Sequence, residues 1–456
     1  MQLQEPKNPN YAATVVRLKH FAELPNCDNL KAALIFGCSV IVSKDAKEGD
    51  LGLFFPVETQ LDAEFVANNN LFRKPEWGNI DPSAKGYFEQ SRRVKAVKFR
   101  GNKSEGFFMP VESLRYTGFD VDALLVDEVF DALEVGGTVH SICRKYIPRR
   151  NLGKLRPAQA RQAKLIDQIV PNQFHFHGDT EQLRRNLHKI HPSDVISISD
   201  KWHGTSVVIS KILTVRNLTW YEKLAQFFGV RVQTTEYGLV YSSRKVVKSV
   251  NGTSKHNNHF YTEDIWGVIA KEVADRVPNG YTLYGEIVGY TPDGSPIQGG
   301  YHYGCPVGGH KFLVYRVTLT NRDGVVLELS WPQMFDFCAK YGFEMVKELY
   351  YGKAGHLIES WPPATLRLQN GEDWESVFLS ALEDMFVPDK MCEHNNFEVP
   401  AEGVVVRIDH LNEAEAFKLK AFAFLERESK SLDKGELDIE TAESEEETIT
   451  TQEEAA

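Results

Sequence analysis

One lysine in this chain stands where it could act as a covalent nucleophile. It is Lys201, in the run Asp200-Lys201-Trp202-His203-Gly204, where a strand-like pattern gives way to a turn. A lysine amine attacks only when it is neutral, and desolvation or a nearby cation, including a metal ion, favours that form. The glycine that follows lets the backbone approach a bound ligand closely. A lysine before a turn is most often solvated, so this run alone is a weak indication of chemistry.

Other ionisable and aromatic groups follow at intervals, each beside or inside an apolar run typical of a strand. They are Arg244 in YSSRK, Glu286 in LYGEIVG, Tyr315 in KFLVYRV, Glu402 in AEGVVVR, and Lys418 with Lys420 in FKLK. Charges there are costly unless they are paired or line a cavity. Because side chains alternate along a strand, Lys418 and Lys420 share one face. Two ammonium groups on one face favour a polyanion between them; two solvated lysines are the alternative.

The elements that must position these groups fall into two parts. Over about the first 140 residues, short apolar runs such as TVVRL, CSVIVS and LGLFFPV alternate with turn signals, which is typical of a small sandwich or barrel. From about Asp194, VISISDKWHGTSVVIS indicates two strands around a tight turn, and further strands are predicted in YTLYGEIVGY, KFLVYRVTL and GVVVRID. Helical spacing marks YTEDIWGVIAKEVADRV, WPQMFDFCAKYG and SVFLSALEDMF. The predicted fold class is α+β, a small N-terminal β-barrel followed by an antiparallel-sheet domain.

Two segments of biased charge lie outside these parts. From Arg144 to Lys164 there are eight Lys or Arg and no acidic residue, and Arg184, Arg185 and Lys189 follow. This segment is either a solvated linker or a strap that contacts phosphates. From residue 432 to 456 ten acidic residues face only one lysine, which predicts a disordered, solubilising tail. Most of the net charge of −11 resides in that tail, so it does not exclude a nucleic-acid partner.

Several classes of protein are excluded by missing patterns. The chain contains no run of about 18 apolar residues, so no membrane helix is predicted. The N-terminus lacks the apolar core of a secretory signal peptide. The six cysteines form no CxxC pair, so neither a zinc site nor a disulfide framework is indicated, and a reducing cytoplasm is expected. The chain has no GxxxxGK(S/T) phosphate loop, no GxGxxG that opens a helix, and neither HExxH nor GxSxG.

Taken in order, the motifs resemble those of the covalent lysyl-AMP nucleotidyltransferases, which include ATP-dependent RNA ligases, DNA ligases and mRNA capping enzymes. KWHGTS resembles the first motif in its RNA-ligase variant, since other branches usually have aspartate where His203 stands. YSSR, LYGEIVG, FLVYRV, AEGVVVR and FKLK resemble the later motifs, over residues of about 195–422. The loop GYTPDGSPIQGGYHYG is similar to that of the nick-sealing RNA ligase 2 type. Two departures are Tyr315, where phenylalanine is common, and Ser206, where asparagine is common.

The N-terminal stretches ELPNCDNLKAALIFGCSVIVSKDAKEGDLGLFFPVETQL and VKAVKFRGNKSEGFFMPVESL resemble the OB domain that precedes the catalytic domain in a bacterial and phage RNA-ligase branch. The predicted organisation is therefore an OB-like nucleic-acid-binding domain over 1–143 and a basic linker over 144–193. A nucleotidyltransferase domain over 194–425 and a disordered acidic tail over 426–456 follow.

The resemblance also implies an activity. Lys201 would take AMP from ATP and pass it to a 5′-phosphate end, which a 3′-hydroxyl then attacks. The implied role is the repair of nicked RNA-containing duplexes by a cytoplasmic monomer. The resemblance assigns catalysis to Lys201, Lys418 and Lys420, and ATP binding to Asp200, His203, Gly204, Arg244, Glu286, Tyr315 and Glu402, with Mg²⁺ or Mn²⁺ held by Glu402 and Glu286. Tyr315 would stack on adenine.

Three alternatives stay open at this point. The chain could be an ATP-dependent DNA ligase, although His203 and the OB-like region before the catalytic domain argue against this. It could also be a non-catalytic nucleic-acid-binding protein with a degenerate ligase domain. His175 and His177, in HFHGD, could form a metal-ligand pair, but we interpret them as loop residues.

Overall fold

The computed structural model describes residues 2–148, 158–252, 261, 263–387, 389–410 and 413–436. Within these ranges the chain forms two compact units. The first comprises 2–148, 184–187 and 422–436, and the second comprises 158–183 and 188–421. All ten candidate site residues belong to the second unit.

The first unit is built mostly from short antiparallel strands, as the alternating apolar runs predict. Its largest sheet has the order β10-β6-β2-β11, from Gly106–Pro110, Leu51–Pro56, Ala13–Arg17 and Val129–Phe130. A second sheet joins β3 (Phe21–Glu23), β4 (Leu30–Ile35) and β5 (Cys38–Ser43). One apolar core of this unit includes Phe55, Phe65 and Phe130, and a second one joins Val40 of β5 to Phe54 of β6. No sheet closes on itself among the described strands, so the barrel stays a prediction.

Helix α9 (Phe422–Asp433) also belongs to the first unit. Phe422 and Phe424 are buried, at 5% and 2% exposed. Further along the helix, Arg93 donates to the Ser429 carbonyl oxygen at 2.7 Å while it pairs with Glu58 at 2.9 Å. The segment predicted to be disordered from residue 426 therefore begins inside a packed helix, because apolar and ionic contacts hold it. Residues 437–456 lie outside the described residues.

The basic segment predicted over 144–193 contains regular structure as well. Helix α2 spans Ala158–Ile166, and residues 149–157 lie outside the described ranges. Arg185 donates to the carbonyl oxygens of Pro9 and of Ala12, the latter at 3.1 Å. Arg184 lies 3.8 Å from the Glu105 carboxylate. These two arginines make contacts within the first unit, and the phosphate strap stays a prediction.

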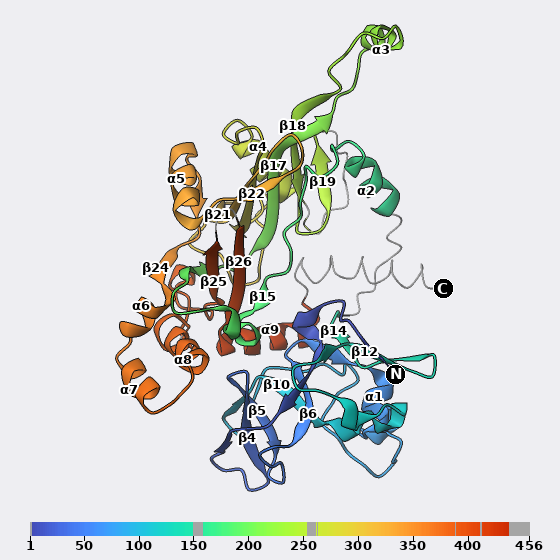
Figure 1. The fold of residues 1–456 in the computed structure, drawn as a ribbon, viewed down its shortest axis with the longest axis vertical. Coiled ribbons are helices and arrows are strands. Elements are labelled where there is room, and N and C mark those ends of the chain that lie inside the picture. The colour runs from blue at the N-terminus through green and yellow to red at the C-terminus, as the bar shows by residue number, and fades with distance from the viewer. Residues whose placement is uncertain are drawn as a thin grey trace. The chain divides into compact units, whose positions relative to one another are not determined.

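The second unit consists of two mostly antiparallel sheets with helices around them (Figure 1). One sheet has the order β15-β26-β25-β16-β24, from Glu181–Gln182, Glu413–Lys420, Gly403–His410, Val195–Lys201 and Glu348–Lys353. The other has the order β19-β18-β17-β20-β21-β22, from Val247–Val250, Thr235–Ser242, Thr205–Val215, Tyr281–Gly289, His310–Thr320 and Val326–Glu328, with β23 (Glu344–Met345) pairing in parallel with β21.

The strands on either side of Lys201 belong to different sheets. β16 pairs with β24 and β25, whereas β17 pairs with β18 and β20. The predicted strand-turn-strand is therefore confirmed, but it is not a hairpin. Residues 202–204 carry the chain from one sheet to the other, which places Lys201 at the end of one sheet and beside the start of the next.

The helices predicted from apolar spacing are confirmed as α4 (Ile265–Val273), α5 (Trp331–Tyr341) and α8 (Trp374–Phe386). The shorter helices α6 (Ala354–Glu359) and α7 (Pro363–Gln369) lie between the last two along the chain. Helix α3 (Trp220–Phe227) buries none of its residues and projects at the far end of β17 and β18 (Figure 1). Among the residues that the structure describes, no helix has both the length and the apolar character needed to span a membrane.

Candidate active site

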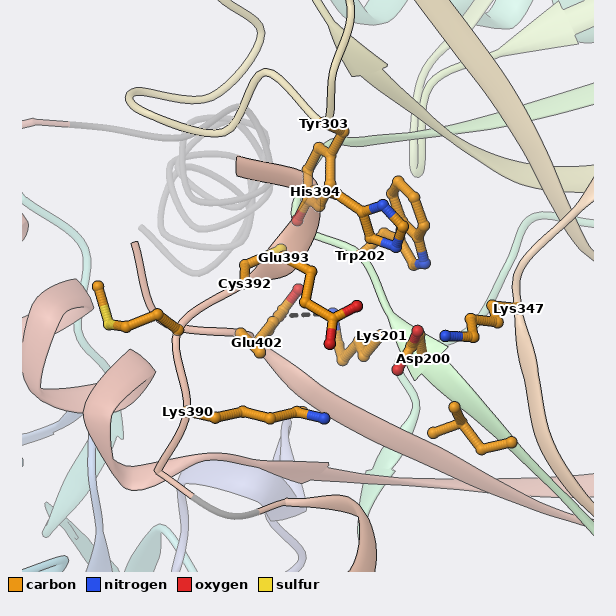
Figure 2. A pocket seen from close by; sticks show the side chains of 14 residues that line it. Asp200, Lys201, Trp202, Tyr303, Lys347, Lys390, Cys392, Glu393, His394 and Glu402 are labelled. Carbon is orange, nitrogen blue, oxygen red and sulfur yellow. Dashed lines mark ion pairs between the residues drawn. The ribbon is translucent and has the colours of Figure 1, made fainter. Parts of the chain in front are cut away.

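A buried carboxylate joins the first and the last of the predicted catalytic lysines. Strand β25 begins at Gly403, which is in register with Lys201 on one side and with Lys420 on the other. Glu402, the residue before it, is only 3% exposed. Its Oε1 lies 2.7 Å from Nζ of Lys201 (Figure 2) and 3.8 Å from Nζ of Lys420. Residues more than 200 positions apart thus meet because β16 and β26 flank the same strand.

Neighbouring cations stabilise the ionised form of the Glu402 carboxyl. Burial alone would raise the pKa of this carboxyl, but the cations of Lys201 and Lys420 and the nearby His203 outweigh burial and lower it. The ion pair holds Nζ of Lys201 beside this carboxylate. Oε2 of Glu402 is buried and accepts no hydrogen bond from the described residues. An anionic oxygen in that position fits a hard divalent cation.

The turn after Lys201 is held by Glu286 on β20. One oxygen of Glu286 accepts a hydrogen bond from the backbone N–H of Gly204 at 3.0 Å, and the other accepts from the Ser206 hydroxyl at 3.2 Å. A Cβ on Gly204 would lie 2.2 Å from the Ile287 carbonyl oxygen. The glycine is therefore needed because the turn runs against β20, rather than because a ligand approaches it. Since both oxygens of Glu286 already accept hydrogen bonds, its geometry fits the positioning of this turn better than the predicted metal role.

A loop that sequence reasoning left without a role fixes the same turn. Tyr303 accepts a hydrogen bond from the His203 backbone N–H at 2.7 Å, and Gln298 donates to the Gly204 carbonyl oxygen at 2.8 Å. Burial, and then the charge of Glu402, raise the pKa of Tyr303 well above 10.0, so its hydroxyl stays protonated. In the sequence this loop showed a cluster of aromatic residues and glycines and a similarity to the loop of the nick-sealing type, and neither feature shows what the loop contacts.

Lys418 lies in a second group of charges. Burial, followed by the ammonium groups of Lys420 and Lys201, lowers the pKa of Lys418 from 10.5 to about 7, and Arg244 acts in the same direction. Asp179 opposes these effects, and it forms an ion pair with Arg244. The structure thus brings Lys418, Arg244 and Lys201 together, and adds the carboxylate of Asp179, which sequence reasoning missed.

Tyr315 is placed by an irregularity in β21. Tyr284 is in register with Arg316 and Gly285 with Val314, so Tyr315 is the extra residue of a bulge, a device that redirects a side chain. The ring of His177 lies 5.1 Å from that of Tyr315 and 5.9 Å from that of Tyr284. The HFHGD segment is a loop, as predicted, and it also brings His177 beside Tyr315 and Asp179 beside Arg244.

The predicted metal ligands do not form a dense cluster. Within the described ranges, no group of three or more His, Cys, Asp or Glu side chains is arranged to hold a metal ion. Asp200 lines the pocket beside Lys201, and burial raises the pKa of its carboxyl even though Lys347, Lys390 and His394 act in the opposite direction. A metal at this site would therefore rely on Glu402 and on oxygens of the substrates.

The solved structures that resemble this one share its fold. A Naegleria gruberi RNA ligase with AMP and Mn has a TM-score of 0.53 and 14% identity, covering 91% of this chain and 98% of that chain. A Naegleria gruberi RNA ligase with ATP and Mn has a TM-score of 0.52 and 14% identity, covering 93% and 99%. Another form with ATP and Mn has a TM-score of 0.52 and 15% identity, covering 91% and 98%. The comparison with curated proteins found no match.

Two mostly antiparallel sheets meet at a lysine that pairs with a buried glutamate, in a fold similar to that of the solved ligases. The RNA ligase family model matches residues 194–421, which is half of the 456 residues. The chain belongs to the RNA ligase family.

Proposed function

We propose that this protein is an ATP-dependent RNA ligase that joins 3′-hydroxyl and 5′-phosphate ends through an AMP carried on Lys201. The observation that carries the proposal is the contact of Lys201 and Lys420 with one buried carboxylate, Glu402, at 2.7 and 3.8 Å. Membership of the RNA ligase family supports it. Complexes of Naegleria gruberi RNA ligase with ATP and Mn or AMP and Mn support the choice of ATP and a divalent metal.

Three displacements at phosphorus make up the reaction. Nζ of Lys201, once deprotonated, forms a bond to the α-phosphorus of ATP, and the bond to the pyrophosphate oxygen breaks. An oxygen of the RNA 5′-phosphate then bonds to the AMP phosphorus as the P–N bond breaks, and the amine regains a proton. Finally the 3′-hydroxyl oxygen attacks the activated 5′-phosphorus, loses its proton, and AMP departs.

Each of these steps gathers negative charge on phosphate oxygens, so positioned cations supply much of the catalysis. Lys418 and Lys420 share one face of β26 and neutralise that charge, and Arg244 grips the nucleotide phosphates or ribose. Tyr315 stacks on adenine. Glu402 would hold a divalent metal through its buried second oxygen, and the metal would supply charge neutralisation at the phosphates. Asp200, His203, Gly204 and Glu286 keep the turn in place.

The finer substrate assignment also belongs to this proposal. We expect nicked duplexes that contain RNA to be the preferred substrate, as in RNA repair, with the first unit acting as an OB-like nucleic-acid-binding domain. The loop over 290–309 supports the nick-sealing type, because it is rich in glycine and aromatic residues and packs against the turn after Lys201. We further expect a cytoplasmic monomer.

The proposal is tested by following the covalent intermediate. Incubation with ATP labelled at the α-phosphate and Mg²⁺ or Mn²⁺ should label the native chain, and peptide mapping should place the label on Lys201. Lys201→Ala should carry no label, and Glu402→Ala and Lys420→Ala should fold but label at least about a hundredfold more slowly. Lys223→Ala is a matched control, because Lys223 lies on α3, which buries no residue.

A ligation panel tests the substrate. Nicked duplexes with RNA or DNA on the 3′-hydroxyl side, single strands with 5′-phosphate ends, and a broken hairpin are compared at equal concentration. Sealing that requires RNA at the 3′-hydroxyl side supports the proposal, whereas equal sealing of all-DNA nicks would point to a DNA ligase. Label that remains on Lys201→Ala would overturn the assignment of the nucleophile.

A further inference from the structure

A pocket opens beside Lys201, and part of its lining comes from residues that the motifs do not include. Lys201 and Glu402 contribute to its lining, and so do Trp202, Lys347 and His394 (Figure 2). Lys347 follows β23, whereas His394 lies in the short 3-10 helix Glu393–Asn395. Segments from three distant parts of the sequence therefore converge on the amine that the proposed function loads with AMP.

Aromatic rings form one wall of this pocket. The ring of Trp202 lies 4.5 Å from that of Tyr303 and 4.9 Å from that of His394, with interplanar angles of 30° and 27°. Tyr303 is buried, Trp202 is half-buried, and His394 is exposed. The group thus extends from the interior, beside the turn after the nucleophile, to a flat ring at the surface. Flat, exposed rings of this kind bind nucleobases by stacking with little dependence on sequence.

Two lysines form another part of the lining. Lys347 and Lys390 are exposed, and in Figure 2 their side chains extend toward the centre of the pocket from different segments. Among the described residues neither ammonium group forms an ion pair, although both influence Asp200 through space. By contrast, Lys201, Lys420 and Arg244 all pair with carboxylates. Two ammonium groups that face one pocket without an ion pair suit an anionic ligand.

The carboxylates of the pocket limit what kind of anion it can hold. Glu402 is already matched by Lys201 and Lys420, so Asp200 and Glu393 are the acidic groups left to balance Lys347 and Lys390. The net charge of the pocket is then close to zero. A ligand must therefore be held by directed contacts with the ammonium groups and by ring stacking rather than by the overall field, which favours a phosphate attached to a nucleobase over a bare polyphosphate.

We propose that this pocket receives the 5′-phosphorylated terminal nucleotide of the RNA strand. The terminal phosphate lies between Lys347 and Lys390, and the terminal base stacks on His394. The proposal rests on the function proposed above, since this phosphate must reach the AMP bound to Nζ of Lys201. There its oxygen forms the new P–O bond as the P–N bond breaks, and the leaving amine takes a proton from water. The opposite, 3′-hydroxyl end carries no terminal phosphate for the two lysines to bind.

The test separates the loading of AMP from its transfer. Protein preloaded with labelled AMP is mixed with 5′-phosphorylated RNA, and transfer to the RNA is followed in a single turnover. The variants are the double substitution Lys347→Met with Lys390→Met, and His394→Ala with His394→Phe. We expect the double variant to form lysyl-AMP yet transfer it about a hundredfold more slowly. His394→Ala should slow transfer about tenfold, and His394→Phe, which keeps a flat ring, should restore it.

Matched controls lie outside the pocket in the same unit. Lys340→Met removes an exposed lysine from α5, and Phe397→Ala removes an aromatic ring that is 63% exposed. Both should transfer AMP at the native rate. RNA with a 5′-hydroxyl should compete for binding much less effectively against native protein than 5′-phosphorylated RNA, and the double lysine variant should lose this discrimination.

Each outcome has one meaning. Transfer at the native rate in the double variant and in His394→Ala overturns the proposal. Slow formation of lysyl-AMP in the double variant, together with weaker inhibition by pyrophosphate, also overturns it, because the lysines would then bind the phosphates of ATP. If native protein never forms lysyl-AMP, the proposed ligase function itself fails, and that result is distinct from normal loading followed by unaffected transfer.

Discussion

The contact between Lys201 and Glu402 should be measurable as a coupling free energy. The perturbation is a double-mutant cycle of Lys201→Met and Glu402→Gln, which remove one charge each and keep the size of the side chain. In the native chain Oε1 of Glu402 lies 2.7 Å from Nζ of Lys201 and 3.8 Å from Nζ of Lys420. Lys201→Met therefore leaves a buried carboxylate with only the more distant partner, whereas the double variant leaves no buried carboxylate.

The size of the effect follows from burial. Removing one partner of a fully buried ion pair costs about 3–5 kcal/mol. The side chain of Glu402 is 2% exposed but that of Lys201 is 25% exposed, and Lys420 stays near the carboxylate, so we expect about 2 kcal/mol for Lys201→Met. Glu402→Gln should cost about 1–2 kcal/mol, since it leaves two ammonium groups facing each other. The double variant should be more stable than the sum predicts by about 1–2 kcal/mol.

Urea unfolding at equilibrium, compared between variants of equal denaturant dependence, measures the cycle. Costs that add to within about 0.3 kcal/mol would show that the two groups do not interact, and our account of the site would then be wrong. The same four proteins separate structure from chemistry. The double variant should lose less stability than the two single variants added together, and yet form no lysyl-AMP.

Three further outcomes are expected. The pKa of Lys418 is lowered from 10.5 to about 7. Between these values the unfolded chain holds a proton that the folded chain lacks, so native stability relative to Lys418→Met should rise with pH over this window and be flat below it in urea unfolding. Asp179→Asn removes the carboxylate that occupies Arg244, so the KM for ATP in the labelling assay should fall about threefold, worth about 0.7 kcal/mol; a rise would show that Asp179 orients Arg244 instead. Gly204→Ala places a Cβ 2.2 Å from the Ile287 carbonyl oxygen, and the displaced turn should slow lysyl-AMP formation about a hundredfold with little change in KM; native rates would contradict this.

Much of the fold was within reach of the sequence because it depends on local pattern. Apolar spacing of 3.6 residues predicted α4, α5 and α8, and apolar runs predicted β20, β21 and β25. Such patterns follow from the need to bury one side of each element, and they do not depend on which other element covers that side. They cannot show where a chain segment stops belonging to one unit, which is why helix α9 and the stretch 184–187 joined the first unit unexpectedly.

The sequence predicted the main residues of the site but not the partners that hold them. The order of the motifs pointed to Lys201, Glu286, Glu402 and the lysines of β26, because an unusual ionisable residue within an apolar strand is visible in one dimension. The partners were not visible. Asp179 and Tyr303 lie in loops whose sequence has no periodicity, and they reach the site only because the chain folds back on itself.

The sequence by itself determined the residue types that can form a lysyl-AMP site and the strands that carry them. The tertiary structure alone decided that β16 and β17 lie in different sheets, that one buried carboxylate serves both Lys201 and Lys420, and that Trp202 and His394 share a pocket with the nucleophile. The physical reason is that strand propensity and side-chain alternation act between neighbours in the chain. The pairing of charges and the stacking of rings, in contrast, depend on which distant segments the packed core brings within a few ångströms of one another.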